Sequence, residues 1–323
     1  MKKYASRWLF DRHEVGSLDA IRGKNFYIKF ESPVSDKWTG EDPRLEAMIF
    51  AQTFQVAQSA MQLIQAVDCL VDTVANSDDI DFLIVHAVND EEENQKIRDH
   101  FGLYFYDAGQ TTIFQKPGSI HALKIAGKAS FRTKYIIGLH KYFISCGLHC
   151  THWIDLDPGH SPNIPLSPFT HDHLRYAYAI MIAYSIIEEL QLEIRASSTK
   201  PSHLADGTWN PKVKGDLENR LTAAHIDLSE PVPWNVRGGL KTLEKRRKPN
   251  AIGKAEWAYG AVRDCEVDII DAINDLSWIR SKITAHKVDK DIRKLSVYDV
   301  ANAQHLARRL LLETMGYWKK LHA

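Results

Sequence analysis

The spacing of apolar and polar residues predicts a mixture of strands and helices in residues 1–157. Residues 25–30 alternate with a period of two, which is typical of a strand. Residues 44–74 contain no Gly or Pro and carry apolar residues at helical spacing, which predicts one long helix. We also expect a buried strand at 81–88, a polar helix at 91–100, short strands at 103–106 and 111–114, and a helix at 129–146.

A proline-rich segment follows this first part. Four of the twelve prolines lie at positions 158, 162, 165 and 168. Proline fixes φ and removes a backbone donor, so this run predicts an extended connector rather than a helix. The sequence therefore indicates three regions: an α+β accessory or sensor domain at 1–157, a linker at 158–169 and a second domain at 170–323.

The second domain shows only helical spacing. We expect helices at about 170–196 and 211–224, an irregular stretch at 227–253, and a third helix at about 254–287 with apolar residues three and four positions apart. A fourth helix begins after Ser296, which with Asp299 forms a variant of the capping box, while Leu295 and Val300 form the hydrophobic staple. Four helices predict a bundle, so the fold class is mostly α with an N-terminal α+β domain.

Composition and charge narrow the function classes. Lys plus Arg and Asp plus Glu both number 41, which excludes a uniformly basic nucleic-acid coat protein but allows a local basic face. The second domain carries 24 bases against 20 acids and is the better candidate for an anionic partner. Four cysteines are too few for a disulfide scaffold and fit a reducing cytosol. With no signal peptide and a longest nearly apolar run of only 176–187, we expect a cytoplasmic protein without a membrane span.

The end of the third predicted helix carries the residues that indicate chemistry. Arg280 and His286 lie about 60° to either side of Ile283 on an ideal helix, so both border the apolar seam. A histidine can take a proton from a ribose 2′-hydroxyl or give one to the leaving oxygen. An arginine can stabilise the charge that develops on phosphorus. This pair suits RNA cleavage without a metal or another cofactor.

The bundle together with the R-x5-H motif resembles the HEPN superfamily, over about residues 170–320. In that family an R-x4–6-H motif supplies the catalytic pair, and dimerisation forms the active cleft. The resemblance implies a metal-independent endoribonuclease of a toxin or antiviral defence setting, with Arg280 and His286 as catalytic residues. Ser281 stands where active members often carry Asn, Asp or His. The alternative is a non-catalytic HEPN-like module for RNA binding or dimerisation.

A cluster of bases precedes the motif. We expect it to bind RNA phosphates, with Trp234 stacking on an unpaired base, although a solvated loop explains the same charges. The cluster consists of Arg237, Lys241, Lys245, Arg246, Arg247 and Lys248.

Two further expectations concern a partner copy and a metal. The apolar stripe of Trp278, Ile279 and Ile283 beside the motif predicts a homodimer, or a higher homo-oligomer, that meets at the third helix. Zinc ligands are typically Cys and His, but the spacing in 140–173 lacks a matching second pair, so we expect a helix end with buried cysteines and no metal. The residues of that group are His140, Cys146, His149, Cys150, His152, His160, His171 and His173. The first domain senses a trigger, shapes the substrate channel or restrains the second, and the sequence leaves these three roles open.

Overall fold

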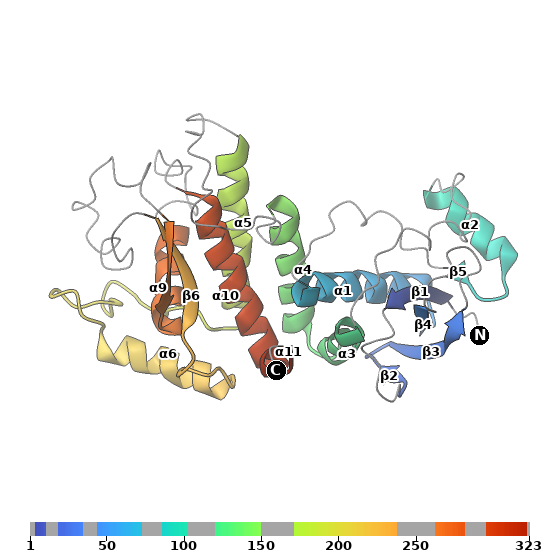
Figure 1. Cartoon of the computed structure of the whole chain (residues 1–323), viewed down its shortest axis with the longest axis horizontal. Helices are drawn as coiled ribbons and strands as arrows, with labels where there is room; N and C mark the ends of the chain where they lie inside the picture. The colour runs from blue at the N-terminus through green and yellow to red at the C-terminus, as the bar shows by residue number, and fades with distance from the viewer. Residues whose placement is uncertain are drawn as a thin grey trace. The chain divides into compact units, whose positions relative to one another are not determined.

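The chain is mostly helical with small antiparallel sheets and divides into two compact units, Met1–Leu139 and His140–Ala323 (Figure 1). The computed structural model describes residues 4–10, 19–34, 44–72, 86–101, 120–149, 171–237, 262–281 and 295–321. The predicted linker at 158–169 and the predicted strands at 103–106 and 111–114 lie outside these residues.

The first unit is built on a five-stranded sheet with the order β2-β3-β4-β1-β5, in which every pairing is antiparallel. The predicted strand at 25–30 is confirmed as part of β3. The strands are β1 (Tyr4–Phe10), β2 (Ile21–Arg22), β3 (Phe26–Val34), β4 (Arg44–Ala51) and β5 (His86–Ala87).

Two helices cover one face of this sheet. Ile28 and Ile49 are opposite each other and fully buried, whereas Tyr27 and Phe50, one residue along, stack with their ring centroids 5.0 Å apart and stay half-buried. The helices are α1 (Phe54–Asp72) and α3 (Ile120–Ala129). Helix α3 packs closely on β2, since a Cβ added at Gly127 would lie 2.6 Å from a side-chain carbon of Ile21. The predicted polar helix at 91–100 is confirmed as α2 (Glu91–Phe101).

The prediction of one helix over 44–74 is wrong, because its first residues form strand β4. Residues 47–49 and Ala51 are buried, with Ala47 and Ile49 fully so, and β4 pairs with β3 on one side and β1 on the other. These residues satisfy both a strand period and a helix period, and pairing with two distant strands decides in favour of the strand. The helix begins only at Phe54.

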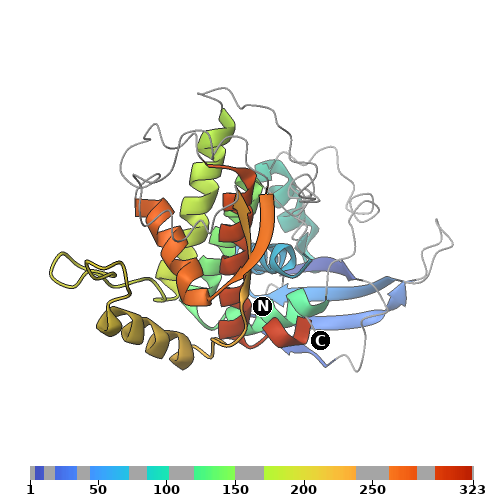
Figure 2. The same ribbon diagram turned by 60° about the vertical axis from the view of Figure 1, so that its left-hand side comes forward.

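The second unit is organised around one central helix, α10 (Val297–Met315), which packs against α5 (His171–Glu189) and strand β6 (Val232–Arg237) (Figures 1 and 2). The unit also contains α6 (Pro211–Ala223), β7 (Val262–Val267), α9 (Ile269–Ile279) and α11 (Trp318–Leu321). Helix α4 (Thr133–Leu148) begins in the first unit and ends in the second. The prediction at 129–146 therefore joined the end of α3 to α4, and the one at 170–196 extended α5 too far.

The prediction that the second part is helical throughout is also wrong. Strands β6 and β7 form an antiparallel pair with Val232 opposite Val267 (Figure 2). The expected helix over 254–287 therefore contains a strand at 262–267, and α9 begins two residues after it. From Ile269 to Ile279 the predicted apolar seam is buried as expected. The separation of strand and helix depends on the partner strand, which local spacing does not reveal.

Helix boundaries that depend on local caps are confirmed. Asn210 caps α6 by accepting a bond from the Lys212 N–H at 3.1 Å, with Pro211 in the first turn. The Asp299 carboxylate accepts bonds from the Ser296 N–H at 2.9 Å and its hydroxyl at 3.0 Å, and Leu295 and Val300 are buried beside this capping box. Gly316 ends α10 with φ at 75°, a conformation that favours glycine.

Buried polar side chains of α10 fix its neighbours through their backbones. The Gln304 amide donates to the carbonyl oxygens of Ser145 at 3.1 Å and His149 at 2.7 Å, at the end of α4. The Asn302 side chain accepts from the Asn235 N–H at 2.8 Å and donates to its carbonyl at 2.9 Å, in the manner of a neighbouring strand. Because backbone groups rather than side chains are bound, these contacts set the position of α4 and β6 along α10.

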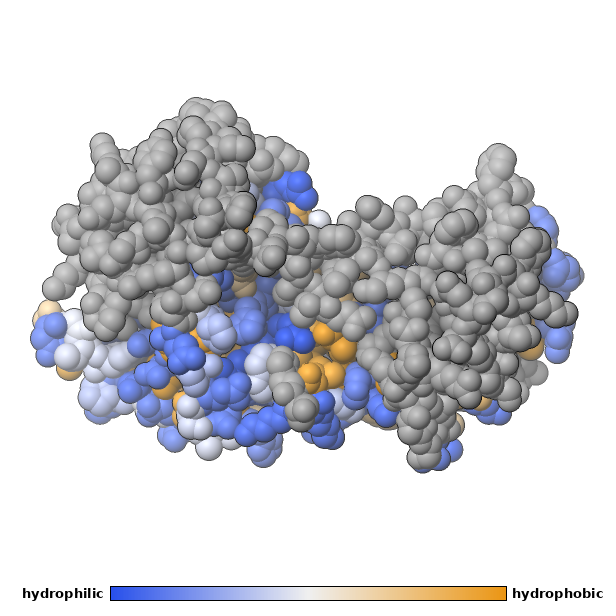
Figure 3. Space-filling view, in the orientation of Figure 1, coloured by the Kyte–Doolittle hydropathy of each residue, from blue (hydrophilic) through white to orange (hydrophobic). Residues whose placement is uncertain are grey.

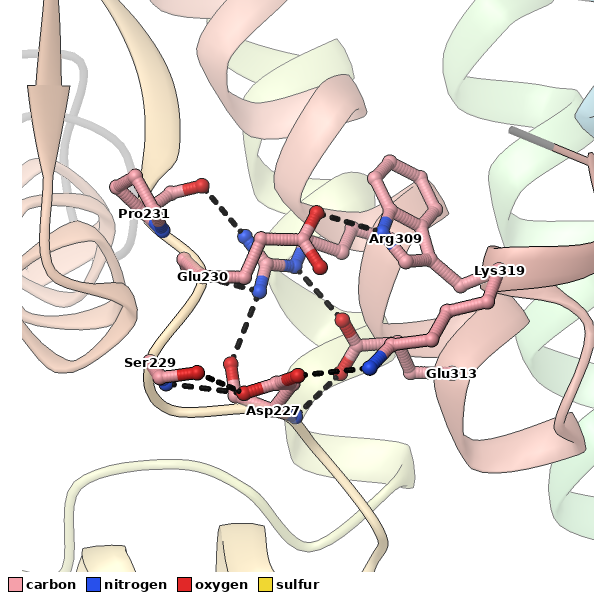
Figure 4. Close-up of polar contacts among 8 residues, drawn as sticks. Asp227, Ser229, Glu230, Pro231, Arg309, Glu313 and Lys319 are labelled. Atoms are coloured by element: carbon pink, nitrogen blue, oxygen red, sulfur yellow. Dashed lines mark hydrogen bonds and ion pairs between the residues drawn. The ribbon is translucent and has the colours of Figure 1, made fainter. Parts of the chain in front are cut away.

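The third such side chain, Arg309, carries a charge and is fully buried. Its guanidinium lies between α10 and the segment that leads into β6 (Figure 4). Nε donates to Glu313 at 2.9 Å, while the terminal nitrogens donate to the carbonyl oxygens of Pro231 at 2.8 Å, Glu230 at 2.9 Å and Asp227 at 3.0 Å. The other oxygen of Glu313 accepts from the Asp227 N–H at 3.0 Å. This arrangement closes the segment 227–231 onto the helix.

Where Figure 3 is coloured, the visible face is mainly hydrophilic, with a small apolar area near the middle of the view. No helix of the described residues is both long and apolar enough to cross a membrane. Several large apolar side chains are nevertheless exposed, and the most exposed of them is Phe131.

We predict that Arg309→Ala lowers the free energy of unfolding by about 3–5 kcal/mol, because it leaves the buried Glu313 carboxylate and three carbonyl groups without their donor. Urea unfolding followed by tryptophan fluorescence measures this change. The control is Lys96→Ala, which removes an exposed ion pair with Glu92 and should change the free energy by about 0.5 kcal/mol or less. Equal effects of the two substitutions would contradict the role of Arg309.

A second prediction concerns pH and the exposed end of the same cluster. The Ser229 hydroxyl, then Lys319 and the Ser229 N–H, hold the pKa of Asp227 well below its ordinary value of 3.8. The ionised carboxylate therefore stabilises the fold above that value, and this contribution is lost as the pH falls below it. In urea titrations between about pH 5 and pH 2, the parent should lose more stability than Asp227→Asn. Parallel pH curves would disprove the linkage.

Candidate functional site

The arginine of the motif lies where helix α9 ends. Arg280 is the C-cap residue and keeps a right-handed helical conformation, with φ at −55° and ψ at −48°. Helix α9 packs here against α5, so Arg280 and the last residues of α5 lie close together. The side chain is 40% exposed, so part of it is accessible to solvent.

Two residues of α5 hold Arg280. Its terminal nitrogen lies 3.2 Å from a carboxylate oxygen of Glu188, and its guanidinium carbon lies 5.9 Å from the ring centroid of Tyr184. The first contact is an ion pair that is open to water on both sides, and the second is a cation–π contact against a buried ring. Together they restrict the directions in which the guanidinium donates.

The tyrosine in this group is buried. Burial raises the pKa of Tyr184, and a hydrogen bond with the Ser277 side chain opposes that effect. The hydroxyl therefore stays protonated and neutral at ordinary pH, and Tyr184 provides a fixed surface rather than an acid or base. We define Tyr184, Glu188, Ser277 and Arg280 as the Arg280 cluster.

The Arg280 cluster can present a positive fork of donors to an anion. One terminal nitrogen points to Glu188, and the fork has five N–H donors in total. A phosphate oxygen that approaches the exposed side would find a guanidinium whose orientation is already fixed. Sequence analysis missed Glu188 and Tyr184; the only signal was the acidic pair Glu188 and Glu189 at the end of an otherwise apolar stretch.

The proposed catalytic partner of Arg280 is outside the described residues. His286 lies beyond residue 281, where this part of the description ends, so the approach of the two side chains stays a prediction. Ser281 is described and exposed, and its hydroxyl donates to the Trp278 carbonyl at 3.1 Å. In this conformation the Ser281 hydroxyl forms a hydrogen bond with the backbone of the preceding turn.

The expected RNA-binding residues are mostly outside the described chain as well. Lys241, Lys245, Arg246, Arg247 and Lys248 lie between β6 and β7, and Arg237 is the last residue of β6, opposite Val262.

The expected stacking role of Trp234 is wrong. Its side chain is 2% exposed, and its indole N–H donates to Asp275 of α9 at 3.2 Å. This hydrogen bond joins the β6–β7 pair to α9. Because the indole ring is buried, it offers no face on which a base could stack.

The expected dimer surface needs a similar correction. Ile279 is 1% exposed and packs inside its own unit, so it offers no area to a second copy. Trp278 is half-buried, and Ile283 lies outside the described residues. The amphipathic spacing of this helix is explained by packing within the chain, while the homodimer itself stays a prediction.

Among the described residues, no three Cys, His, Asp or Glu side chains are arranged to hold a metal ion. Cys146 is buried, and the His149 ring contacts Tyr176 edge to face with centroids 4.8 Å apart. Burial lowers the pKa of His140. Cys150, His152 and His160 lie outside the described residues, so zinc binding by the full group of 140–173 stays untested.

Comparison with known proteins gives no relative: no protein-family model, no curated protein and no solved structure matches this chain.

Proposed function

We propose that the chain is a metal-independent endoribonuclease of HEPN type, with Arg280 and His286 as its catalytic pair in a homodimer cleft. The observation that carries this proposal is the Arg280 cluster. A half-exposed arginine, oriented by Glu188 and Tyr184, lies at the end of α9, six positions before the histidine of the motif. The likeness to the family further suggests a toxin or antiviral defence setting.

The proposed reaction uses groups of this chain alone. Neutral His286 accepts the proton of a ribose 2′-hydroxyl, and the 2′-oxygen attacks the adjacent phosphorus. The bond from phosphorus to the 5′-oxygen breaks, and a protonated histidine, from the second copy in a dimer, supplies the proton that this oxygen needs. Arg280 stabilises the negative charge on the phosphoryl oxygens. The products carry a 2′,3′-cyclic phosphate and a 5′-hydroxyl.

The second candidate is a non-catalytic HEPN-like module that binds RNA or forms dimers. The observation that favours it is the ion pair between Arg280 and Glu188. This ion pair gives Arg280 a structural role in the packing of α9 on α5, and that role needs no substrate. The two candidates differ in whether RNA is cut, so a cleavage assay separates them.

We predict that His286→Ala and Arg280→Ala each reduce RNA cleavage about 10²–10⁴-fold, because the first removes the proton-transfer group and the second a donor to the transition state. Arg280→Lys should restore little, since a point charge does not reproduce a planar fork. Release of 2′,3′-cyclic phosphate ends in the presence of EDTA measures the rate, and thermal melting reports the fold.

Arg195→Ala is the matched control. Arg195 is also a partly exposed arginine of the second unit, paired with Glu193 at 2.8 Å, but it lies in the loop after α5. Its loss should leave cleavage unchanged. If both variants of the motif cut RNA as fast as the parent, the ribonuclease proposal fails. A parent that binds RNA or forms a dimer but cuts no RNA under these conditions would support the binding-module candidate instead.

A further prediction concerns the bases between β6 and β7. Replacing Lys245, Arg246, Arg247 and Lys248 together by Ala should weaken RNA binding and reduce its dependence on salt, because fewer counterions are then released on binding. Fluorescence anisotropy of a labelled RNA over a salt series measures both effects. An unchanged affinity at low salt would show that this run is a solvated loop.

A further inference from the structure

A second surface in the first unit combines an exposed aromatic ring with a concentration of positive charge. Phe131, in the turn between α3 and α4, has a side chain that is 57% exposed. It is the most exposed large apolar residue of the described chain. Phe131 belongs to the first unit, which ends at Leu139. Its exposure is therefore not explained by the Arg280 cluster, which belongs to the second unit.

The turn that carries Phe131 is held in place. The Ser130 hydroxyl is buried and donates to the Gly127 carbonyl at 2.7 Å, while it accepts from the Lys24 N–H at 2.8 Å. The Arg132 N–H donates to the Ala129 carbonyl at 3.0 Å, and the Arg132 carbonyl accepts from the Tyr135 N–H at 3.0 Å. Both neighbours of Phe131 are thus fixed, so its ring is displayed from an ordered backbone rather than from a loose loop.

The charged residues that neighbour this turn along the chain are all basic. Residues 108–154 contain no Asp or Glu, and the described part of this stretch supplies bases on both sides of Phe131. The backbone of Lys24 also lies beside the turn, because its N–H donates to the Ser130 hydroxyl. The nearest helix with acids is α1, which packs against α3 and carries Asp68 and Asp72. The cations at the turn are Lys24, Lys124, Lys128, Arg132 and Lys134, of which all but Lys134 are exposed and Lys134 is half-exposed.

Two of these cations are oriented by a neighbouring ring. The Arg132 guanidinium carbon lies 5.9 Å and the Lys134 nitrogen 5.3 Å from the ring centroid of buried Tyr135. Such contacts hold the cations near the turn, where both can meet phosphates spaced along one strand. An exposed ring among oriented cations has the composition of a surface that stacks on a base and binds the flanking phosphates.

We propose that this turn is a binding site for single-stranded RNA, with Phe131 stacking on an unpaired base and Arg132, Lys128 and Lys134 contacting phosphates. The choice of RNA rests on the proposed function, whereas the stacking ring and the charge are independent of it. A membrane surface fits less well, because anchoring to a bilayer takes a broad apolar face on an amphipathic helix, and the turn itself presents a single ring.

The test is binding of a fluorescent 12-residue oligouridine RNA to the full chain carrying His286→Ala, so that binding is measured without cutting. Phe131→Ala should weaken binding about tenfold, the effect of losing one stacked base. Phe131→Trp should keep the affinity of the parent, and Phe131→Leu should be as weak as Phe131→Ala, since it keeps apolar area without a ring. Arg132→Ala should reduce the slope of log affinity against log salt by about 0.7.

Two controls match these changes. Ile144→Ala removes another exposed apolar side chain, 51% exposed on α4, and Lys212→Ala removes an exposed cation of α6; neither should alter the affinity. Unchanged binding by Phe131→Ala, or full binding by Phe131→Leu, overturns the proposal. So does binding of the parent to phosphatidylserine vesicles that is lost in Phe131→Ala while RNA binding persists. Because cleavage is not measured, these outcomes do not depend on whether the Arg280 pair is catalytic.

Discussion

The second unit depends on one buried charge. Arg309 has no exposed surface, so its guanidinium must find all of its partners within the protein. It takes four of them: one carboxylate on its own helix and three carbonyl oxygens of the segment before β6. Burial raises the pKa of Glu313, and the nearby guanidinium opposes that shift. A buried arginine is therefore tolerated only if the segment 227–231 lies where its carbonyls can accept.

The same logic extends along α10. Asn302, Gln304 and Arg309 lie on a helix that is almost entirely buried, and each binds the backbone of a different neighbour. Apolar packing alone tolerates small sliding movements of one helix on another. Hydrogen bonds to chosen carbonyls do not, because a shift of one residue leaves a buried donor without an acceptor. Hydrogen bonds thus fix the positions of α4 and β6 along α10, and packing on the same helix places α5.

Contacts between residues close together in the sequence could be predicted, whereas contacts between distant residues could not. The capping box of Ser296 and Asp299 was predicted because its two residues lie only three positions apart. The strands at 44–51 and 262–267 were mistaken for helix, because their apolar residues fit either period and the deciding partner strand lies elsewhere. Trp234 looked available for stacking only because Asp275, 41 residues later, leaves no trace in the surrounding sequence. Arg280 was found by its motif, but the residues that orient it belong to another helix.

The junction between β7 and α9 has a mechanical consequence. A single residue, Asp268, separates the last residue of the strand from the first of the helix, and Trp234 of the paired strand bonds to Asp275, about two turns further on. The short junction at Asp268 and the bond from Trp234 to Asp275 connect the strand pair to α9 at two points. They leave α9 little freedom to move relative to the strands. A displacement of the β6–β7 pair would therefore act directly on α9, whose last turn leads to Arg280.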